Sequence, residues 1–315
     1  MHIPTKQFDT IDIILPENVI KYKGKVRNVY IRGHQFVSVA TDRISAFDHV
    51  LLRTIPFKGQ VLNQIAAHFL DEVKDIVPVW LDNCPHPNVS VGKNCMPIRL
   101  EMVIRGYLSG HAWREYRSGN RQICGIEMPK GMIENDPFPE PIITPTSKAD
   151  IGHDIDVSRI EILANEIVTE DVLNQLEDYT RALFKRGQEI ALQRGLILVD
   201  TKYEFGMFDD KIFLMDEIHT PDSSRYFYAE SYFDNQLRGN KQNQLSKEFV
   251  REWLITNDFQ GLEGQSLPAM SDELTTEISE RYIHLYELIT GIKFIPADYD
   301  TLEADINSEV QKVFS

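Results

Sequence analysis

Two segments that lie far apart in this chain each read as a β-hairpin, and they restrict the fold more than any other feature. Residues 25–41 carry β-branched and aromatic residues on both sides of a turn at Gly33 and His34. Residues 196–218 repeat the pattern as LILVDTKYEF, a turn within GMFDD, and KIFLMDEI. Strands joined by tight turns run antiparallel. With the helical segments described next, the sequence predicts an α+β fold of mostly antiparallel sheets with packed helices.

Three helices are predicted from apolar residues that recur at helical spacing. One begins near Gly59 and ends before Pro78, and we expect it to cover one face of the first sheet. A second begins after Thr169, a predicted N-cap, and ends at Gly195. A third begins after Ser271 and ends at Gly291.

The 315 residues exceed the length at which a single hydrophobic core usually divides. We predict a β-rich lobe over residues 1–98, a central α+β lobe over 99–240, and a helical segment over 241–315 that packs on the body. Five prolines between residues 129 and 145 remove backbone donors, which predicts a long loop without regular structure. Its apolar residues Phe138, Ile142 and Ile143 favour an ordered loop that packs on the body.

The net charge of −15 disfavours nonspecific binding to nucleic acid or to an anionic membrane, so anionic partners should be small molecules. The three cysteines are odd in number and contain no CxxC pair, which fits a reducing compartment. No apolar run is long enough to span a bilayer, and the N-terminus has no signal-peptide pattern. We therefore expect a cytoplasmic protein.

Charged residues gather in both hairpins. If residues 21–27 are extended, Lys21, Lys23, Lys25 and Arg27 project to one side, where an anion would relieve their repulsion. In the second hairpin Asp200, Lys202 and Glu204 share a face, and antiparallel pairing returns Asp216 to within about two residues of their level. A solvated surface with weak ion pairs explains each cluster equally well.

An ATP site accounts for both clusters at once. Lys25 and Arg27, beside the flexible Gly24, can make charge-assisted hydrogen bonds to phosphates. Carboxylates such as Asp216 and Glu204 suit Mg²⁺, which prefers oxygen ligands. Single cations at element boundaries are further candidates for anion binding, and their alternative is a surface ion pair: Arg43, Arg105, Lys148 and Arg225.

Taken in order, the motifs resemble the SAICAR synthetase (phosphoribosylaminoimidazole-succinocarboxamide synthase) family over roughly residues 20–255. They are GKVRNVY, ATDRISAFD, PFKGQVLNQ, RLEMVIRGYLSG, PEPIITPTSKADIGHD, LVDTKYEFG, MDEIHTPDSSRY and SYFDNQLR. The resemblance implies a two-lobed fold related to ATP-grasp and kinase-like folds. It implies a ligase that joins a carboxyaminoimidazole ribonucleotide to L-aspartate while ATP becomes ADP and phosphate, through an acyl phosphate.

The resemblance also implies residue roles. Those for the nucleotide are Lys25, Arg27 and Lys148 at the phosphates and cleft, and Glu204 at the ribose. Those for Mg²⁺ are Asp216 and Asp154, the latter beside His153. Those for the ribonucleotide are Ser45, Asp48, Arg105, His111, Lys202, Arg225 and Arg238, with Lys202 and Arg105 also catalytic.

Two positions depart from the family pattern: His111 stands where a serine is usual, and Asn28 where aspartate is common. The serine's role then passes to the imidazole, to Ser109 or to water. Two other functions use the same ATP-binding residues. They are a small-molecule kinase of related architecture and a nucleotide-binding protein without activity.

Overall fold

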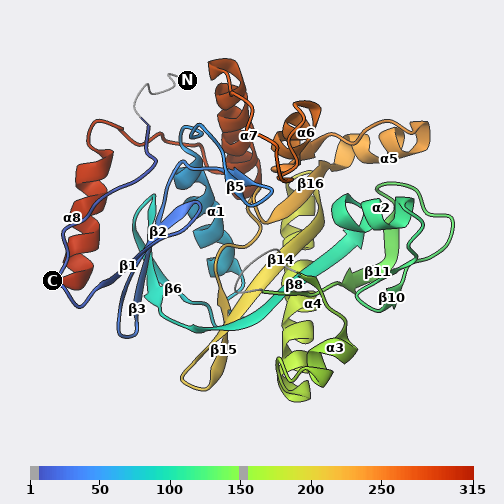
Figure 1. Cartoon of the computed structure of the whole chain (residues 1–315), viewed down its shortest axis with the longest axis horizontal. Coiled ribbons are helices and arrows are strands. Elements are labelled where there is room, and N and C mark those ends of the chain that lie inside the picture. Colours follow the sequence, from blue (N-terminus) through green and yellow to red (C-terminus); the bar gives the residue numbers. More distant parts are fainter. Residues whose placement is uncertain (1–6, 149–154) are drawn as a thin grey trace.

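Two antiparallel sheets dominate the computed structural model, which describes residues 7–148 and 155–315 (Figure 1). Five strands between residues 20 and 93 form the first sheet, and eight strands between residues 96 and 245 form the second. Two short hairpins accompany them: β4 Ser45–Ala46 with β5 His49–Val50, and β9 Gln122–Ile123 with β10 Ile126–Glu127. The predicted α+β class with mostly antiparallel sheets is confirmed.

The first sheet contains the first predicted hairpin. Its strands, in spatial order, are β1 Ile20–Lys23, β2 Arg27–Arg32, β3 Gln35–Ala40, β7 Val89–Lys93 and β6 Leu81–His86. The turn between β2 and β3 contains Gly33, whose φ of 58° lies in the left-handed region that glycine adopts at little cost. Each neighbouring pair of strands is antiparallel.

The prediction that all four cations of residues 21–27 project from one extended strand is wrong. β1 ends at Lys23, and the Gly24 N–H donates to the Arg27 carbonyl at 2.8 Å, so the chain reverses. Lys21 consequently donates to a backbone carbonyl of the N-terminal segment at 2.5 Å. Only Lys25 and Arg27 remain for the cleft described below.

Three helices surround the first sheet: α1 Lys58–Glu72, α7 Asp272–Thr290 and α8 Leu302–Phe314. α1 packs against β3, β6 and β7, and α7 packs against α1, whereas α8 contacts β6 and β7. The Ser271 side chain accepts a hydrogen bond from the Leu274 N–H at 3.2 Å, and Gly291 ends α7 with φ 71°. These caps confirm the predicted bounds of the third helix.

The second sheet contains the other predicted hairpin. Its main path runs β13 Ile155–Asp156, β12 Thr146–Ser147, β8 Met96–Tyr107, β14 Leu196–Phe208, β16 Ser224–Tyr228 and β17 Gln244–Leu245. β15 Lys211–Met215 pairs with β14 beyond β16, through a turn in which Asp209 and Asp210 both have positive φ. β14 therefore has neighbouring strands on both sides and is not a solvated edge of the sheet. This position does not fit the alternative in which its charged residues only form weak ion pairs in solvent.

Helix α4, Glu170–Gln193, packs on β8 and β14. The Thr169 hydroxyl accepts a hydrogen bond from the Val172 N–H at 3.3 Å, and Glu170 and Asp171 occupy the first turn, where the helix dipole favours negative charge. Leu173, Leu176 and Leu183 bury the predicted apolar stripe. The remaining helices of the described residues are α2 Gly110–Arg117, α3 Arg159–Ala164, α5 Ala229–Arg238 and α6 Glu248–Thr256.

The proline-rich segment is more regular than predicted. β11, Pro137–Ile143, pairs with β8 at its ends, with a register shift between Pro137 and Ile142. Proline is tolerated there because an irregular strand does not need every backbone donor. Phe138 and Ile143 are buried, and Ile142 packs against the cluster that contains Phe138, so the segment packs on the body as predicted.

The two sheets are connected along the chain and in space. β8 begins three residues after β7, and Val79 pairs with Leu214 across the junction, where the Trp80 N–H donates to the Leu214 carbonyl at 3.0 Å. One continuous core cluster includes side chains from both sheets and from α1, α4 and α7.

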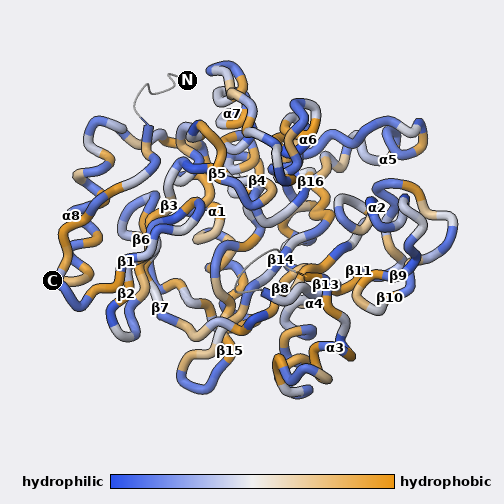
Figure 2. The backbone as a smooth tube through the Cα atoms, viewed as in Figure 1, coloured by the Kyte–Doolittle hydropathy of each residue, from blue (hydrophilic) through white to orange (hydrophobic). Residues whose placement is uncertain are grey.

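Hydrophobic and hydrophilic residues are interspersed along the described part of the chain (Figure 2). Among the described residues, no helix has the length and apolar character needed to cross a membrane.

Candidate active site

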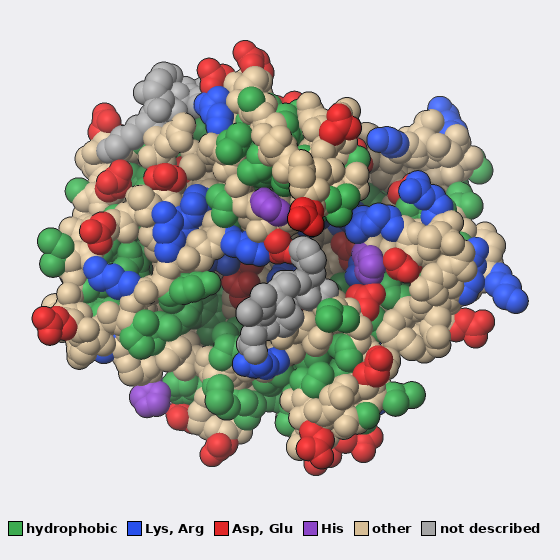
Figure 3. Space-filling view, viewed as in Figure 1, with side chains coloured by type: hydrophobic (Ala, Val, Ile, Leu, Met, Phe, Trp, Pro, Cys, Tyr) green, Lys and Arg blue, Asp and Glu red, His purple; other side chains and the backbone are tan. Residues whose placement is uncertain are grey.

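Two adjoining cavities lie between the sheets, and space-filling shows charged side chains around a hollow at the centre of one face (Figure 3). We call them the polar cavity, of about 560 Å³, and the apolar cavity, of about 480 Å³. The polar cavity is lined mainly by residues of β8, β14 and β16, the 45–48 loop and the start of α6. The apolar cavity is lined mainly by β2, β3, β7 and α1.

A row of three charged side chains crosses the polar cavity. Strand pairing sets Arg105 of β8 opposite Asp200 of β14, and Asp200 opposite Arg225 of β16. The Arg225 Nη1 donates to Asp200 Oδ2 at 2.6 Å, while the Arg105 Nη1 lies 3.6 Å from the same oxygen. Two arginines thus share one carboxylate, which leaves positive charge facing the cavity.

Helix α6 adds a second group of charges at one end of the polar cavity. The Arg225 Nη2 donates to Glu248 Oε2 at 2.9 Å, and the Arg251 Nη1 donates to the same oxygen at 3.1 Å. Burial would raise the pKa of Glu248, but the two guanidinium groups lower it to about 2. Glu248 therefore stays ionised and orients both arginines.

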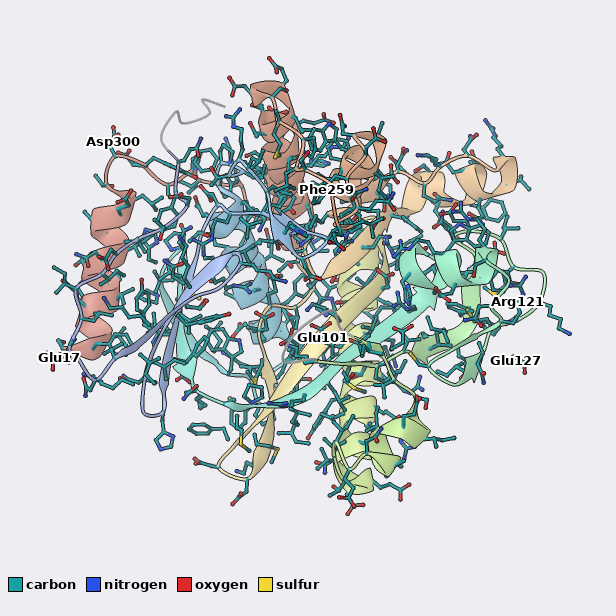
Figure 4. The ribbon with its side chains drawn as sticks, viewed as in Figure 1. Glu17, Glu101, Arg121, Glu127, Phe259 and Asp300 are labelled. Carbon is teal, nitrogen blue, oxygen red and sulfur yellow. The ribbon has the colours of Figure 1, made fainter. Side chains whose placement is uncertain are left out.

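The two cavities meet at a cluster of four charged residues, near the labelled Glu101 in the centre of Figure 4. Three of them lie on β8 and β14, and the fourth, Lys148, follows β12. The Lys202 Nζ donates to Glu101 Oε1 at 2.6 Å and to Glu204 Oε1 at 3.1 Å, and Lys148 pairs with the other oxygen of Glu204. Strand register sets Glu101 directly opposite Glu204, an arrangement of like charges that needs these ammonium groups between them.

The titration behaviour of this cluster follows from its pairing. Burial would raise the pKa of Glu204, but Lys202 and Lys148 outweigh it and lower the pKa to about 2. Burial would lower the pKa of Lys202, but Glu204 and Glu101 reverse that effect and raise it. Both partners remain charged at neutral pH.

The mouth of the apolar cavity carries charged residues from both hairpins. The Arg27 Nη1 donates to Asp216 Oδ1 at 2.8 Å, and its Nη2 lies 2.6 Å from Glu217 Oε2. The latter is an ion pair without hydrogen-bond geometry. Lys25 pairs with Asp48 at 2.5 Å and so connects the apolar cavity to the polar one. The cations of the first hairpin and the acids of the second therefore converge, as predicted.

Behind this mouth the apolar cavity narrows between the first sheet and α1. Trp80 contacts Phe36 edge to face, and its indole N–H donates to the Asp216 carbonyl at 3.0 Å. The close approach of Trp80 also explains why residue 92 is a glycine, because a Cβ at this position would lie 2.0 Å from the Trp80 carbonyl oxygen. An apolar slot that ends in cations and carboxylates suits a nucleobase joined to phosphates.

Comparison with known proteins gives the family. The family model described as SAICAR synthetase matches residues 20–265. This chain belongs to the SAICAR synthetase family. The phosphoribosylaminoimidazole-succinocarboxamide synthases of Cytophaga hutchinsonii and Flavobacterium psychrophilum are 58% and 59% identical to it, covering 95% and 96% of this chain and 96% of each relative. The structure described as SAICAR-synthase from Saccharomyces cerevisiae complexed SAICAR aligns with a TM-score of 0.76 at 30% identity, over 90% of this chain and 98% of that one.

Most residues implicated by the resemblance to the SAICAR synthetase family lie in the two cavities. The polar cavity contains Ser45, Asp48, Arg105, His111, Lys202 and Arg225. The apolar cavity contains Lys25, Arg27, Glu204 and Asp216. Lys148 reaches both through its pairs with Glu204 and Glu101.

One of the expected residues is not brought to the site. Arg238 is exposed at the end of α5 and lines neither cavity. Asp154 and its neighbour His153 lie outside the described residues. Asn28 is buried, and its side chain accepts a hydrogen bond from the Arg43 Nη2 at 2.9 Å, so it orients Arg43 rather than facing a cavity.

His111 lines the polar cavity, and its Nε2 lies 2.8 Å from Asp156 Oδ2. It stands at the start of α2, beside Gly110, where a Cβ would lie 2.6 Å from the Arg225 Nη2. The imidazole thus faces the same cavity that the usual serine of the SAICAR synthetase family is expected to face.

Sequence reasoning missed a buried network between the cavities. Lys58 and Lys247 lie 3.1 and 3.2 Å from Asp222 Oδ2, and the Tyr282 hydroxyl donates to Asp222 Oδ1 at 2.5 Å. Burial would raise the pKa of Asp222, but the two lysines lower it well below the usual range. Asp222 and Lys58 belong to the strings MDEIHTPDSSRY and PFKGQVLNQ, but neither string indicates that they pair, and Lys247 lies outside every string. The pairing was missed because the partners are distant in sequence.

Proposed function

We propose that this protein joins 5-amino-1-(5-phosphoribosyl)imidazole-4-carboxylate to L-aspartate, forming the succinocarboxamide SAICAR while ATP is converted to ADP and phosphate. Membership of the SAICAR synthetase family supports this function. The observation that carries this proposal is the position of Lys202, where the two cavities meet. The Lys202 side chain lines the polar cavity and contacts Glu204, which lines the apolar cavity.

The apolar cavity would hold ATP. Its apolar walls suit the base, Glu204 at its edge suits the ribose hydroxyls, and Lys25 and Arg27 at its mouth suit the phosphates. In the structure these cations pair with Asp48, Asp216 and Glu217. Binding would exchange carboxylate partners for phosphate oxygens.

A Mg²⁺ ion fits beside these phosphates. No group of three His, Cys, Asp or Glu side chains in the described part of the chain could hold a metal alone. Asp216 is partly exposed, and Glu217 Oε2 is buried without a hydrogen bond, so two carboxylates can complete an oxygen shell together with phosphates and water. When bound, the ion would neutralise charge on the transferring phosphoryl group.

The polar cavity would hold the carboxylated ribonucleotide. Arg105 and Arg225, oriented by Asp200 and Glu248, can bind its phosphate and carboxylate groups through paired donors. Ser45 and His111 add hydrogen-bonding groups at the same cavity. Arg114 and Arg251 supply further cations there for anionic groups of the two acceptor substrates.

The chemistry needs alignment more than a protein nucleophile. A carboxylate oxygen of the ribonucleotide attacks the γ-phosphorus of ATP, and the bond from that phosphorus to ADP breaks. The amine of L-aspartate then attacks the acyl carbon, the carbon–oxygen bond breaks to release phosphate, and the amine nitrogen gives up a proton to the solvent. Lys202 lies where the two cavities meet and would offset the negative charge that accumulates during both steps.

The predicted division of the chain stays a proposal: residues 1–98 would supply the nucleotide lobe and 99–240 the acceptor side. The segment 241–315 would do more than pack on the body, because Lys247, Glu248 and Arg251 line the polar cavity. The three free cysteines support our proposal of a reducing, cytoplasmic location.

Replacing Lys202 with alanine tests the function. We expect ADP release and amide formation to fall together by about 100-fold or more, because a charged contact at the reacting groups is lost. The control is Lys211→Ala, an exposed lysine on the same hairpin. ADP release measured with and without L-aspartate, and the product mass, distinguish the ligase from a kinase. Activity of Lys202→Ala within a few fold of wild type would refute the role of Lys202.

A further inference from the structure

The short hairpin of β4 and β5 has a turn that its own sequence does not favour. The two strands are joined by only two residues, Phe47 and Asp48, with φ values of 49° and 62°. Two-residue turns with positive φ at both positions usually contain asparagine, aspartate or glycine. A bulky side chain such as that of Phe47 is strained in this conformation. Contacts from outside the hairpin are therefore needed to keep the turn as it is.

The conformation of this turn matters because of the groups beside it. Ser45, Phe47 and Asp48 all line the polar cavity. Asp48 also pairs with Lys25, but both side chains are about half exposed, and an exposed ion pair is weak. The pair with Lys25 alone would not keep a strained turn in place. If the turn relaxed, Ser45 and Asp48 would shift relative to the rest of the cavity.

The connection that follows α6 supplies the missing contacts. The buried ring of Phe259, labelled in Figure 4, lies edge to face 5.3 Å from the His49 ring and 6.5 Å from the Phe47 ring. Gly261 lies directly against the turn, because a Cβ at this position would be 2.9 Å from the Phe47 carbonyl oxygen and 3.0 Å from the Phe47 Cβ. The connection thus packs on both Phe47 and His49.

Hydrogen bonds fix the backbone of this connection. The Phe259 N–H donates to the Leu254 carbonyl at the end of α6 at 2.9 Å. The side-chain oxygen of Gln265 accepts from the Gln260 N–H at 2.7 Å and from the Leu262 N–H at 3.0 Å. A loop whose backbone is held on both sides of residue 261 can resist the relaxation of a turn that packs against it.

We infer that Phe259 and Gly261 are positioning residues for the ribonucleotide. They hold the turn at Phe47 in its strained conformation and so keep Ser45 and Asp48 in place at the polar cavity. The inference rests on the proposed function, in which the ribonucleotide occupies that cavity. Neither Phe259 nor Gly261 lines the polar or the apolar cavity, so both act through the turn and not by contact with a substrate.

A matched pair of glycine variants tests this role. Gly261 and Gly264 have φ values of 76° and 84°, so alanine adds similar backbone strain at either position. Nothing lies within 4 Å of a Cβ at Gly264, whereas a Cβ at Gly261 meets Phe47. We expect Gly261→Ala to raise the KM for the ribonucleotide about 10-fold, the size of one hydrogen bond to a charged group. Its kcat and its KM for ATP should stay within about threefold of wild type.

Gly264→Ala should leave both KM values within about twofold of wild type. Steady-state kinetics with each substrate varied in turn measures all of these constants. The same KM for the ribonucleotide in Gly261→Ala and Gly264→Ala would overturn the inference, as would an equal rise of both KM values in Gly261→Ala.

A rescue experiment tests the role of Phe259 and does not depend on the glycine variants. Phe259→Ala should raise the KM for the ribonucleotide about 10-fold, because the turn loses its support. Adding Phe47→Gly should restore most of that loss, since glycine adopts a positive φ at little cost and needs no support. If Phe259 only stabilised the core, removing a second aromatic ring would bring no recovery. A double variant no better than Phe259→Ala would therefore contradict the positioning role.

Failure of the inference and failure of the proposed function give different results. Wild type that forms no amide from the ribonucleotide and L-aspartate would refute the proposed function itself. An active wild type, together with a Gly261→Ala variant that matches Gly264→Ala, would refute only the positioning role.

Discussion

At the scale of residues, the site works because buried charges come with partners. Arg225 contacts Asp200 and Glu248, and Lys202 contacts Glu101 and Glu204. Each pair offsets the desolvation that burial imposes on an ion, and removing one partner leaves the other buried and uncompensated. The sequence identified five of these six residues as charged strand positions or motif members, because their neighbours are apolar. Glu248 was missed, since it lies in a helix whose local pattern indicates only packing.

Arg225→Ala should raise the KM for the ribonucleotide far more than the KM for ATP. We expect an increase of roughly 10- to 100-fold, the loss of one or two charged hydrogen bonds to the ligand. The measurement is steady-state kinetics with each substrate varied in turn. Arg117→Ala, at an exposed position of α2, is the control. Equal changes in both KM values would indicate general distortion rather than loss of a ribonucleotide contact.

The buried side chain of His219 makes the stability of the protein depend on pH. It is fully buried, its Nε2 lies 3.1 Å from the Tyr203 hydroxyl, and burial lowers its pKa to about 3. The unfolded chain protonates this residue below about pH 6.5, whereas the folded chain stays neutral until about pH 3. The contribution of neutral His219 to the free energy of unfolding is therefore present above pH 6.5 and is lost as the pH falls.

The test compares wild type with His219→Gln by urea unfolding at pH 7 and pH 5. The free energy of unfolding of wild type should lose about 2 kcal/mol from this group over that range, and the variant should lose none of it. His34→Gln, at an exposed turn, should behave like wild type. A stability difference between wild type and His219→Gln that is independent of pH would contradict the prediction.

At the scale of elements, helix ends and turns were readable because their signals are local. Thr169, Ser271, Gly33 and Gly291 each set a boundary through their own side chain or backbone conformation. The reversal at Gly24 was not predicted, because a run of alternating lysines resembles one strand as much as the two arms of a turn. β11 was missed for a related reason. Its prolines argue against a regular strand, but β11 is irregular and pairs with β8 only at its two ends.

Thr169→Ala should destabilise the protein by about 1 kcal/mol without changing kcat, because it removes the cap of α4 at a position that lines neither the polar nor the apolar cavity. Chemical denaturation measures the free energy of unfolding. Thr169→Ser keeps the hydroxyl and should restore most of the loss. If serine and alanine destabilise equally, the hydroxyl bond to Val172 does not explain the effect.

At the scale of the whole molecule, the C-terminal segment is tied to the first sheet through a buried contact. The Tyr299 hydroxyl donates to Asp42 and accepts from the Phe57 N–H at 2.7 Å, and the Gly59 N–H donates to Asp42 at 3.0 Å. Burial raises the pKa of Asp42 to about 7 although these donors oppose it. The folded pKa exceeds the unfolded one, so the contribution of Asp42 is present below about pH 4 and is lost as the pH rises through 7.

Tyr299→Phe removes a donor to Asp42 and should raise its pKa further. We expect the variant to lose about 1 kcal/mol at pH 5, where the carboxyl is protonated, and about 2–3 kcal/mol at pH 8.5, where it is ionised. Unfolding by urea at both pH values measures the difference. Tyr22→Phe, at an exposed position, should change little at either pH. A loss that shrinks as the pH rises would contradict this account of Asp42.

The sequence by itself determined the fold class, the two hairpins, most helix ends and the family, because periodicity, caps and contiguous motifs are all local. Only the tertiary structure decided that Lys25 and Arg27 meet Asp216, that Lys58 and Lys247 share Asp222, and that Phe259 packs against Phe47. These contacts join residues far apart in the chain. Their geometry depends on how the two sheets pack, which no local pattern specifies.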